Sequence, residues 1–544
     1  MNDVLIFLLN HKNRVIMKKI FLSLILLAFA TGVMAGTQYY RAVFRDDPST
    51  TIDIEWSPSG TSTSPTVYYD IVGHGTTYAS YAYNHGVDRS QSQYSITNEF
   101  SRLTGLTPNT IYYFVIHDAS GTSAMMNFKT LPDNSSSEIS FVSCGDSRTS
   151  LPTSSTNTDR ANNFTLIGKI RPDFATFNGD FIYEGTSGET TTNWEAWLTD
   201  WQNTLGSIGH IVPLIPVMGN HEGSTDMYDF FDVPISNAYD ALQIGGNLLR
   251  LYSLNSELSG EAVCDATEKS WLSNDLALYT GTASEPYWKF AHYHEPFVPH
   301  ANYSAFTTLS ACWAPLFLTY KMNLCCEAHA HCLAISYPIV QSTATGSDHG
   351  FIKDTVNGTV YMGEGGTGAP LYSVYTYYNS THAYNWTRCD TSMFGMEYVC
   401  MNNQEIDIRI VEEVNVSSVG QVAITDPECT LPSGISIWKP SGGTPAIIYY
   451  HGTLTDVPNK YQENQMLHVA PMPAKDMVTI SYPKLNDDAR IEIYTSLGEL
   501  MKTIPVASGS EFKEISIADL DAGTYIAHII SKTETLSCKI VHVH

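Results

Sequence analysis

Five short polar segments along the chain carry the side chains most able to do chemistry. They are Gly-Asp-Ser-Arg at 145–148, Gly-Asp-Phe-Ile-Tyr at 179–183, Gly-Asn-His-Glu at 219–222, His-Glu-Pro at 294–296 and Ala-His-Ala-His at 328–331. Each segment follows an apolar run typical of a buried strand. Together they supply carboxylate, phenol, amide and imidazole donors, which is a set able to hold two metal ions side by side.

A two-metal hydrolytic centre needs one carboxylate that bridges both ions, separate ligands for each ion, and an open position for water. The candidate ligands are carboxylates, one amide oxygen and imidazoles: Asp146, Asp180, Asn220, His294, His329 and His331. Tyr183 adds a phenolate, a hard anionic ligand that suits a trivalent ion. Two ions about 3.5–4 Å apart can generate hydroxide at neutral pH and clamp the oxygens of an in-line displacement.

Each of these residues alone also has an ordinary structural interpretation. His329 and His331 could be polar residues at the end of a strand. Asn220 and His221 could form a turn. Tyr183 could belong to the core, since the chain contains 33 tyrosines. Their joint occurrence in one order favours the dimetal interpretation.

Residues 138–430 alternate strand-like and helix-like segments, which predicts an α/β domain. The strand-like runs are 139–143, 174–178, 211–218, 287–293 and 322–326. Helical periodicity extends over 194–205, 271–279 and 309–320, the last with Pro315 as a possible bend. The polar segments lie just past the carboxyl ends of the strands, where open α/β sheets usually place their sites.

Alternating apolar residues predict β structure on both sides of this domain. Residues 38–131 are expected to form one unit, in which Tyr112 resembles the corner tyrosine of a fibronectin type III sandwich. The polar run 132–137 is a plausible linker. Residues 465–544 are expected to form a further small β unit, after a connection at 431–464.

Composition narrows the class of partner. A chain of 544 residues is long enough for three or four domains, and its net charge of -26 leaves no basic stripe for nucleic acid as the main partner. An anionic substrate would be repelled overall, so its site must be locally positive, most simply through metal ions. The sequence makes no prediction of the oligomeric state.

The N-terminus predicts export. Lys18 and Lys19 precede the apolar run 20–30, and Val-Met-Ala at 33–35 fits a cleavage site, so residues 1–35 are expected to be a signal peptide. Met17 is an alternative start. The apolar run is too short to predict a stable membrane span.

Ten cysteines in an exported chain permit disulfides. Cys389 and Cys400 flank a loop-like stretch and are the first candidates for a pair. Cys325, Cys326 and Cys332 lie close to the fifth polar segment. They are expected to be buried thiols or a disulfide rather than a zinc-thiolate site, because no second closely spaced cysteine pair accompanies them.

The ordered segments resemble those of the purple acid phosphatases, within the metallophosphoesterase superfamily. The family pattern is Asp-x-Gly, Gly-Asp-x-x-Tyr, Gly-Asn-His-Glu, Val-x-x-His and Gly-His-x-His, often preceded by a fibronectin-like domain, and the resemblance covers roughly residues 38–410. It implies a multidomain protein with an N-terminal β-sandwich, a central α/β metallophosphoesterase domain (a β-sandwich flanked by helices) at 138–430, and a small C-terminal β-sandwich.

The resemblance also implies roles for individual residues. By it, Fe(III) would be bound by Asp146, Tyr183 and His331. A divalent iron, zinc or manganese ion would be bound by Asn220, His294 and His329. Asp180 would bridge the two ions, His221 would hydrogen-bond the phosphate and assist catalysis, and Glu222 would support the ligands.

The chain departs from the family pattern in several places. Arg148 stands where a small residue is usual, and it is either a donor to a phosphate oxygen or a surface arginine. Ala328 replaces a glycine, and its methyl group could tighten the turn. The general acid for the leaving group is expected at His300, or less plausibly at His292, against the alternative of a solvated loop histidine. The glycine-rich stretch 363–368 lacks the lysine of a phosphate loop and is expected to end the last strand of the core.

The C-terminal unit resembles the sorting domain of the type IX secretion system. The matching pieces are Pro-Met-Pro-Ala at 471–474, Ile-Tyr at 493–494, Leu-Gly-Glu at 497–499, Ala-Gly-Thr-Tyr at 522–525 and Lys-Ile at 539–540, with Met472 where asparagine is usual. The alternative is a generic β-sandwich for carbohydrate or surface binding. The resemblance implies the type IX secretion machinery as a partner, and a secreted or surface-attached protein.

These observations predict an exported dimetal hydrolase of small phosphate monoesters. A phosphodiesterase or nucleotidase using the same site is the alternative within enzymes. A surface adhesin with a decayed catalytic core is the alternative from another class.

Overall fold

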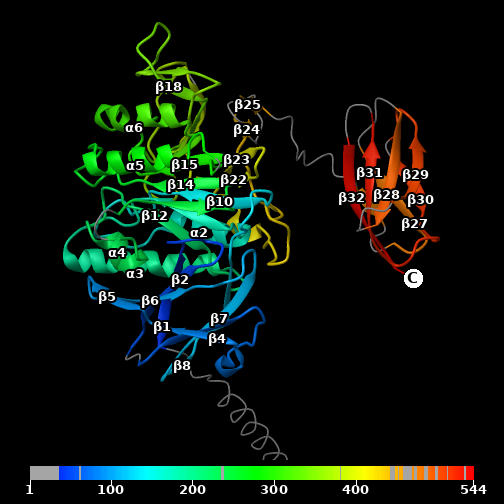
Figure 1. The fold of residues 1–544 in the computed structure, drawn as a ribbon, viewed down its shortest axis with the longest axis horizontal. Coiled ribbons are helices and arrows are strands. Elements are labelled where there is room, and N and C mark those ends of the chain that lie inside the picture. The colour runs from blue at the N-terminus through cyan, green and yellow to red at the C-terminus, as the bar shows by residue number, and fades with distance from the viewer. Residues whose placement is uncertain are drawn as a thin grey trace, which may run out of the picture. The chain divides into compact units, whose positions relative to one another are not determined.

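The computed structural model describes residues 36–543 except 61–62, 235–237, 283, 380–381, 441–446, 451–452, 457–467, 471–473, 483–487, 496–499, 511 and 532–534. The predicted signal peptide therefore lies outside the described residues, as do parts of the expected connection and of the sorting-domain motifs. The chain divides into two compact units, one up to residue 457 and one from residue 458 (Figure 1).

The first unit is built on a large mixed sheet of 11 strands within the described residues. Their order is β25 (Thr453–Asp456), β24 (Ile447–Tyr450), β23 (Ile406–Glu412), β22 (Gly395–Met401), β10 (Ile139–Cys144), β11 (Phe174–Asn178), β12 (Pro213–Val217), β1 (Thr37–Val43), β2 (Ile52–Pro58), β6 (Ile96–Leu103) and β5 (Arg89–Gln93). The central strands β10, β11 and β12 run parallel. Part of the expected connection at 431–464 is thus the hairpin β24–β25 at the edge of this sheet.

The N-terminal β unit shares this sheet with the α/β domain. Strand β1 pairs in parallel with β12, in the register Ala42 to Pro213. A second sheet of the unit contains β4 (Tyr83–Gly86), β3 (Thr66–Asp70), β7 (Ile111–Asp118), β8 (Gly121–Thr122) and β9 (Met126–Lys129), with the short helix η1 (Tyr78–Ser80) beside it. The predicted corner also forms, since the Tyr112 hydroxyl accepts a hydrogen bond from the Thr107 N–H at 2.9 Å.

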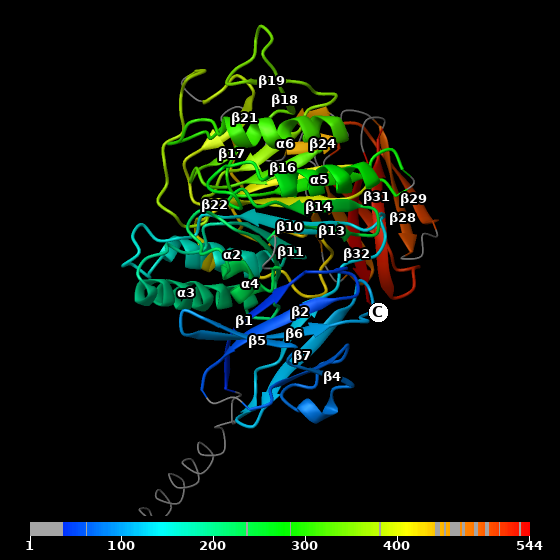
Figure 2. The ribbon, with the colours of Figure 1, turned by 60° about the vertical axis from the view of Figure 1, so that its left-hand side comes forward.

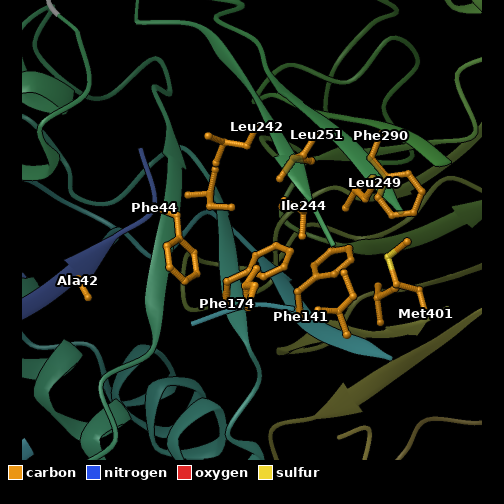
Figure 3. Packing of buried hydrophobic residues seen from close by; sticks show 14 of the residues in the cluster. Ala42, Phe44, Phe141, Phe174, Leu242, Ile244, Leu249, Leu251, Phe290 and Met401 are labelled. Atoms are coloured by element: carbon orange, nitrogen blue, oxygen red, sulfur yellow. The ribbon is translucent and has the colours of Figure 1, made fainter. Parts of the chain in front are cut away.

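A sheet of seven strands packs against the 11-stranded one. Its order is β13 (Asp240–Ile244), β14 (Leu249–Ser253), β15 (Trp288–His292), β16 (Leu324–Glu327), β20 (Val360–Gly363), β17 (Leu333–Ser336) and β21 (Thr387–Thr391). Side chains from both sheets meet in the core shown in Figure 3, where Phe141 stacks on Phe174 at 5.0 Å and lies 6.1 Å from Phe290, ring centre to ring centre. This face-to-face packing holds the strands of the two sheets in one fixed relation.

Helices cover the outer face of each sheet, which is the layered arrangement predicted for the α/β domain (Figures 1 and 2). Helices α2 (Thr158–Ile170), α3 (Ser187–Trp201), η2 (Gln202–Leu205) and α4 (Asp226–Phe231) accompany the 11-stranded sheet, and α5 (Ala266–Leu278) and α6 (Thr307–Tyr320) accompany the other. Trp194, Trp197 and Trp201 form the buried face of α3, as their spacing predicts. The remaining short elements are β18 (Ile339–Gln341), β19 (Phe351–Lys353) and η3 (Val416–Ser418).

The disulfides differ from the expected pair. Cys400 pairs with Cys429, and Cys264 pairs with Cys312. The predicted bond between Cys389 and Cys400 is wrong, because Cys389 lies in β21 of one sheet and Cys400 in β22 of the other. The three cysteines near the fifth polar segment are buried free thiols, which is one of the two expected states.

The second unit is a small two-sheet β structure with its own core. One sheet contains β26 (His468–Ala470), β27 (Met477–Ser481) and β30 (Phe512–Ser516), and the other contains β29 (Leu500–Val506), β28 (Ala489–Thr495), β31 (Gly523–Ile530) and β32 (Thr535–His542). The inward residues follow the period of two read from the sequence, as Val478, Ile480, Ile491 and Ile493 show. Among the described residues, no helix has the length and apolar character needed to cross a bilayer.

Candidate metal centre

The five polar segments follow five strands of the first unit. Asp146, Asp180 and Asn220 come two or three residues after the parallel strands β10, β11 and β12 of one sheet. His294 and His329 each come two residues after β15 and β16, which are parallel neighbours in the other sheet. The packing of the two sheets therefore brings together loops far apart in the sequence, such as those of Asp146 and His329, which are 183 residues apart.

Donor atoms of Asp146, Asp180 and His294 lie within 4.8 Å of one another, and all three residues are buried. His294 Nε2 lies 3.3 Å from Asp180 Oδ1. Across the centre, His331 Nε2 lies 3.3 Å from Asp146 Oδ1. His329 completes the group, with its Nδ1 at 3.3 Å from His294 Nε2.

Hydrogen bonds set the tautomer of two of these imidazoles. His294 Nδ1 lies 2.8 Å from the Asn178 carbonyl oxygen, and His331 Nδ1 lies 2.8 Å from the Pro370 carbonyl oxygen. A carbonyl oxygen only accepts, so both Nδ1 atoms donate. Each Nε2 then keeps its lone pair facing the carboxylates, which is the arrangement of metal-ligating histidines.

Several buried donor atoms have no hydrogen-bond partner, which is rare in protein interiors. They include Asp146 Oδ1, which faces His331 Nε2, and Asn220 Oδ1. Such orphaned acceptors are costly to bury unless a cation satisfies them. The mixture of oxygen and imidazole donors in the cluster suits iron, zinc or manganese, so these residues fit the two-metal group predicted from the sequence.

In the absence of a metal ion, burial and neighbouring charges shift the pKa values of three residues in the cluster. Burial raises the pKa of Asp180, but the positive charges of His294, His221 and Arg148 lower it by more, so this carboxylate is ionised. Burial lowers the pKa of His294, but Asp180 and Asp146 raise it to about 10. Burial and the neighbouring His294 lower the pKa of His329 to about 2, so this ring is neutral and able to coordinate.

The backbone around the ligands is strained. Asp146, Asp180, His329 and His331 have φ values of 53°, 55°, 70° and 50°, in the left-handed region that non-glycine residues seldom adopt. Such outliers persist only where the surrounding structure holds them, and they concentrate at functional sites. Gly179 allows the second and third polar segments to approach closely, since a Cβ there would lie 2.6 Å from the Gly219 Cα.

Glu222 ties the second and third polar segments together. Its carboxylate accepts the backbone N–H groups of Gly219 at 2.9 Å, Asp180 at 3.0 Å and Phe181 at 2.8 Å. This contact orients the loop that carries Asp180.

Tyr183 and His221 lie together at the more open side of the centre. Their rings are 4.5 Å apart, and the His221 side chain is 23% exposed. His221 Nε2 is 3.9 Å from Asp180 Oδ2. Burial lowers the pKa of His221, against the opposing charge of Asp180.

Arg148 is part of the centre and is not a surface arginine, since it is only 6% exposed. Its Nε donates to Asp180 Oδ2 at 3.0 Å, and its Nη1 donates to the Thr149 carbonyl at 3.2 Å. Its Nη2 lies 3.4 Å from His331 Nε2. The guanidinium group thus contacts two candidate ligands, Asp180 and His331.

His300, the expected general acid, is buried and hydrogen bonded in this structure. Both of its ring nitrogens contact protein groups, Nδ1 at 2.5 Å from Glu364 and Nε2 at 2.9 Å from the Thr387 hydroxyl. The residue is 3% exposed, so the alternative of a solvated loop histidine is wrong. His292 is likewise buried and hydrogen bonded through both nitrogens. Acid catalysis by either ring would require it to leave these partners.

The other sequence departures lie close to the ligands. Ala328 is buried, and its methyl group lies 3.0 Å from where a Cβ on Gly145 would be. The glycine-rich stretch does end a strand, β20, but this is not the last strand of the core as expected, since β21, β22 and β23 follow it. It then brings Gly365 against Asp146, where a Cβ would lie 2.3 Å from Oδ2.

Glu295 is a site residue that the sequence reasoning missed. Donor atoms of His294, Glu295 and His329 lie within 4.8 Å of one another. The sequence does place this acidic residue directly after the candidate ligand His294. That position alone does not indicate a site residue, because an acidic residue at the end of a strand is usually exposed to solvent.

Two packed sheets flanked by helices, with carboxylate and imidazole donors on the loops between them, define the metallophosphoesterase class of fold. Residues 156–333 match the family model of calcineurin-like phosphoesterases, which spans the second to fifth polar segments. Residues 37–130 match the purple acid phosphatase N-terminal domain, and residues 468–543 match a secretion system C-terminal sorting domain.

Solved structures agree on the fold. The chain is similar to purple acid phosphatase PPD1 from yellow lupin (Lupinus luteus) seeds, with 16% identity, a TM-score of 0.56, and coverage of 72% of this chain and 73% of that one. It is also similar to a structure of PhoD, with 11% identity, a TM-score of 0.56, and coverage of 80% and 95%. No curated protein sequence matches the chain.

The chain is therefore a phosphoesterase with a purple acid phosphatase N-terminal domain, a calcineurin-like catalytic domain and a secretion sorting domain. These phosphoesterases use a dinuclear metal centre, and the buried donors described above are the candidate ligands. The sorting domain implies export to the cell surface or the medium.

Proposed function

We propose that the protein is an exported dimetal hydrolase of phosphate monoesters. The observation that carries the proposal is the convergence of buried Asp146, Asp180 and His294 donor atoms within 4.8 Å, beside the unpartnered Asn220 Oδ1. Hydrogen bonds alone do not satisfy this set, whereas two cations do.

The proposed ligands fall into two half-sites. Fe(III) is assigned to Asp146, Tyr183 and His331, and a divalent iron, zinc or manganese ion is assigned to Asn220, His294 and His329. Asp180 is assigned as the bridge, since it faces His294 through Oδ1 and Arg148 through Oδ2. Two bound metal ions would supply hydroxide for in-line attack and would stabilise the negative charge on the departing oxygen.

The protein's own groups then bind and orient the substrate. His221 is the most exposed imidazole of the centre and is placed to hydrogen-bond a phosphate oxygen beside Asp180. Arg148 is held by Asp180 and offers a fork of donors to the same oxygens. With both ring nitrogens of His300 engaged, water or His221 is the proton source for the leaving group in this proposal.

Two measurements on the purified protein test the proposal. Elemental analysis should find about two metal ions per chain. Hydrolysis of an aryl phosphate monoester should exceed that of the matching diester. A preference for the diester, or for nucleotides over simple monoesters, would instead establish the alternative of a phosphodiesterase or nucleotidase on the same residues. A chain without bound metal and without hydrolysis would refute the proposal.

Export by the type IX secretion system is proposed from the resemblance of the C-terminal unit to that system's sorting domain, together with the family match at 468–543. Deleting residues 465–544 should leave the protein inside the cell envelope. Normal appearance of the truncated protein outside the cell would contradict this part of the proposal.

A further inference from the structure

Glu295 is an unusual carboxylate. It follows His294 directly, its side chain is 0% exposed, and neither of its oxygens has a hydrogen-bond partner. Its backbone N–H is held by the Ser256 hydroxyl at 3.2 Å, so the residue is anchored at the edge of β15. A buried carboxylate without partners is strongly unfavourable, which indicates that it faces a group able to donate or to carry positive charge.

That group is the imidazole of His329. Its Nδ1 faces His294 Nε2 at 3.3 Å, and the same His294 nitrogen lies 3.3 Å from Asp180 Oδ1. These three atoms surround the proposed position of the divalent ion. The other nitrogen of the ring, Nε2, lies 3.4 Å from Glu295 Oε2 and has no hydrogen-bond partner of its own.

We propose that Glu295 accepts the Nε2–H of His329 and thereby holds Nδ1 towards the divalent ion. An imidazole that coordinates through Nδ1 must carry its proton on Nε2, and a carboxylate facing that proton fixes the tautomer and raises the basicity of the ligating nitrogen. Glu295 is thus a positioning residue for the divalent half-site. The inference rests on the proposed function, because it requires a cation at this half-site.

The contact also sets His329 apart from the other imidazoles. His294 and His331 donate their second nitrogens to backbone carbonyl oxygens. Among these three, only His329 has its second ring nitrogen facing a carboxylate. As the acceptor of the Nε2–H, this carboxylate strengthens the hold on the divalent ion, and it has no such role in the half-site of Asp146 and His331.

Direct coordination by Glu295 is the competing arrangement. The two nitrogens of an imidazole point away from each other, and Glu295 lies on the Nε2 side while His294 lies on the Nδ1 side. The carboxylate therefore faces the ring nitrogen opposite the one that faces His294.

The variant Glu295→Gln tests the proposal in the full chain. It keeps the size of the side chain and removes the charge. We expect the affinity of the divalent half-site for Zn²⁺, measured by competition with a chromophoric chelator, to fall about 10–100-fold. The visible absorption of the iron half-site should stay unchanged. An affinity within twofold of the parent chain would overturn the proposal.

Glu268→Gln is the matched control. Glu268 is also buried, also leaves one carboxylate oxygen without a partner, and accepts a hydrogen bond from the Asn255 N–H in the loop before α5. Its removal should alter stability but not Zn²⁺ affinity. An equal loss of affinity in both variants would mean that the effect of Glu295 is general destabilisation, and would overturn the proposal.

A double-mutant cycle tests whether Glu295 acts through His329. In a His329→Ala background, Glu295→Gln should have no further effect on Zn²⁺ affinity. Additive losses of Zn²⁺ affinity would overturn the proposal. X-ray absorption of the Co²⁺-substituted protein gives a second test: if Glu295→Gln loses an oxygen neighbour of the metal, Glu295 coordinates directly and the proposal is overturned. If the parent chain itself binds no divalent ion, the proposed function fails instead, and this outcome is separate from the others.

Discussion

Replacing Asp180 with asparagine removes the carboxylate proposed to bridge the two half-sites. Its carboxylate accepts hydrogen bonds from Arg148 Nε and from the backbone N–H of His221, and it faces His294 Nε2 at 3.3 Å. Asparagine keeps the shape but cannot bridge two cations as a carboxylate does. We expect Asp180→Asn to lose both metal ions, or to retain one with greatly weakened affinity.

The structure allows two magnitudes to be estimated. The Arg148–Asp180 pair is buried, with side-chain exposures of 8% and 1%, so removing one partner should destabilise the metal-free protein by about 3–5 kcal/mol. Loss of a preorganised electrostatic group of this kind lowers kcat by about 10²–10³-fold. Loss of the ions themselves should lower it further.

Elemental analysis, denaturant unfolding of the metal-free protein and aryl phosphate hydrolysis check this prediction. Asp200→Asn is the control, because it breaks a similar ion pair with buried Arg160, at 2.6 Å, on helices α2 and α3. The control should lose stability but keep its metal content. An Asp180→Asn protein that retains two ions and normal activity would refute the bridging role and the reasoning behind it.

Three further predictions concern other residues of the same unit. Tyr183→Phe should abolish the visible colour expected from a tyrosinate bound to Fe(III), and a parent protein that is colourless yet active with zinc or manganese would contradict the iron assignment. Gly365→Ala should displace Asp146, because the new Cβ would lie 2.3 Å from Oδ2, and elemental analysis should show less iron; unchanged iron content would count against this close contact. Burial raises the pKa of Asp226 to about 7, with the charge of Glu184 adding to the shift, so the folded state holds a proton that the unfolded state releases. The free energy of unfolding should therefore fall as the pH rises from about 4 to 7, by at most about 1.4 kcal/mol per pH unit. Asp226→Asn should remove this part of the fall, as measured by denaturant unfolding of the metal-free protein. Parallel pH curves for parent and variant would contradict that origin.

Much of the local structure was predictable from the sequence. The run 174–178 is strand β11, the tryptophan spacing of α3 gives its buried face, and the alternation at 478–493 marks the inward residues of the small β unit. These features depend on periodicity within a few residues, which the sequence displays directly.

Features that depend on distant contacts were less predictable. The N-terminal unit continues the sheet of the α/β domain through β1 and β12, although the sequence suggested separate units. Cys400 forms a disulfide with Cys429 rather than with Cys389, which is nearer in the sequence. The reason is that β21 and β22, which carry Cys389 and Cys400, belong to different sheets. His300 is buried against Glu364, a residue 64 positions away that no local pattern connects to it.

The same division holds for the metal centre. The sequence by itself determined the chemical types of the donors, their order and their positions after strands, because these are properties of short segments. Only the tertiary structure decided which donors meet, since the edges of two packed sheets bring Asp146, Asp180 and His294 within 4.8 Å. It also decided that Glu295 faces His329 and that Arg148 lies inside the centre, because side-chain direction and burial follow from packing between segments far apart in the chain.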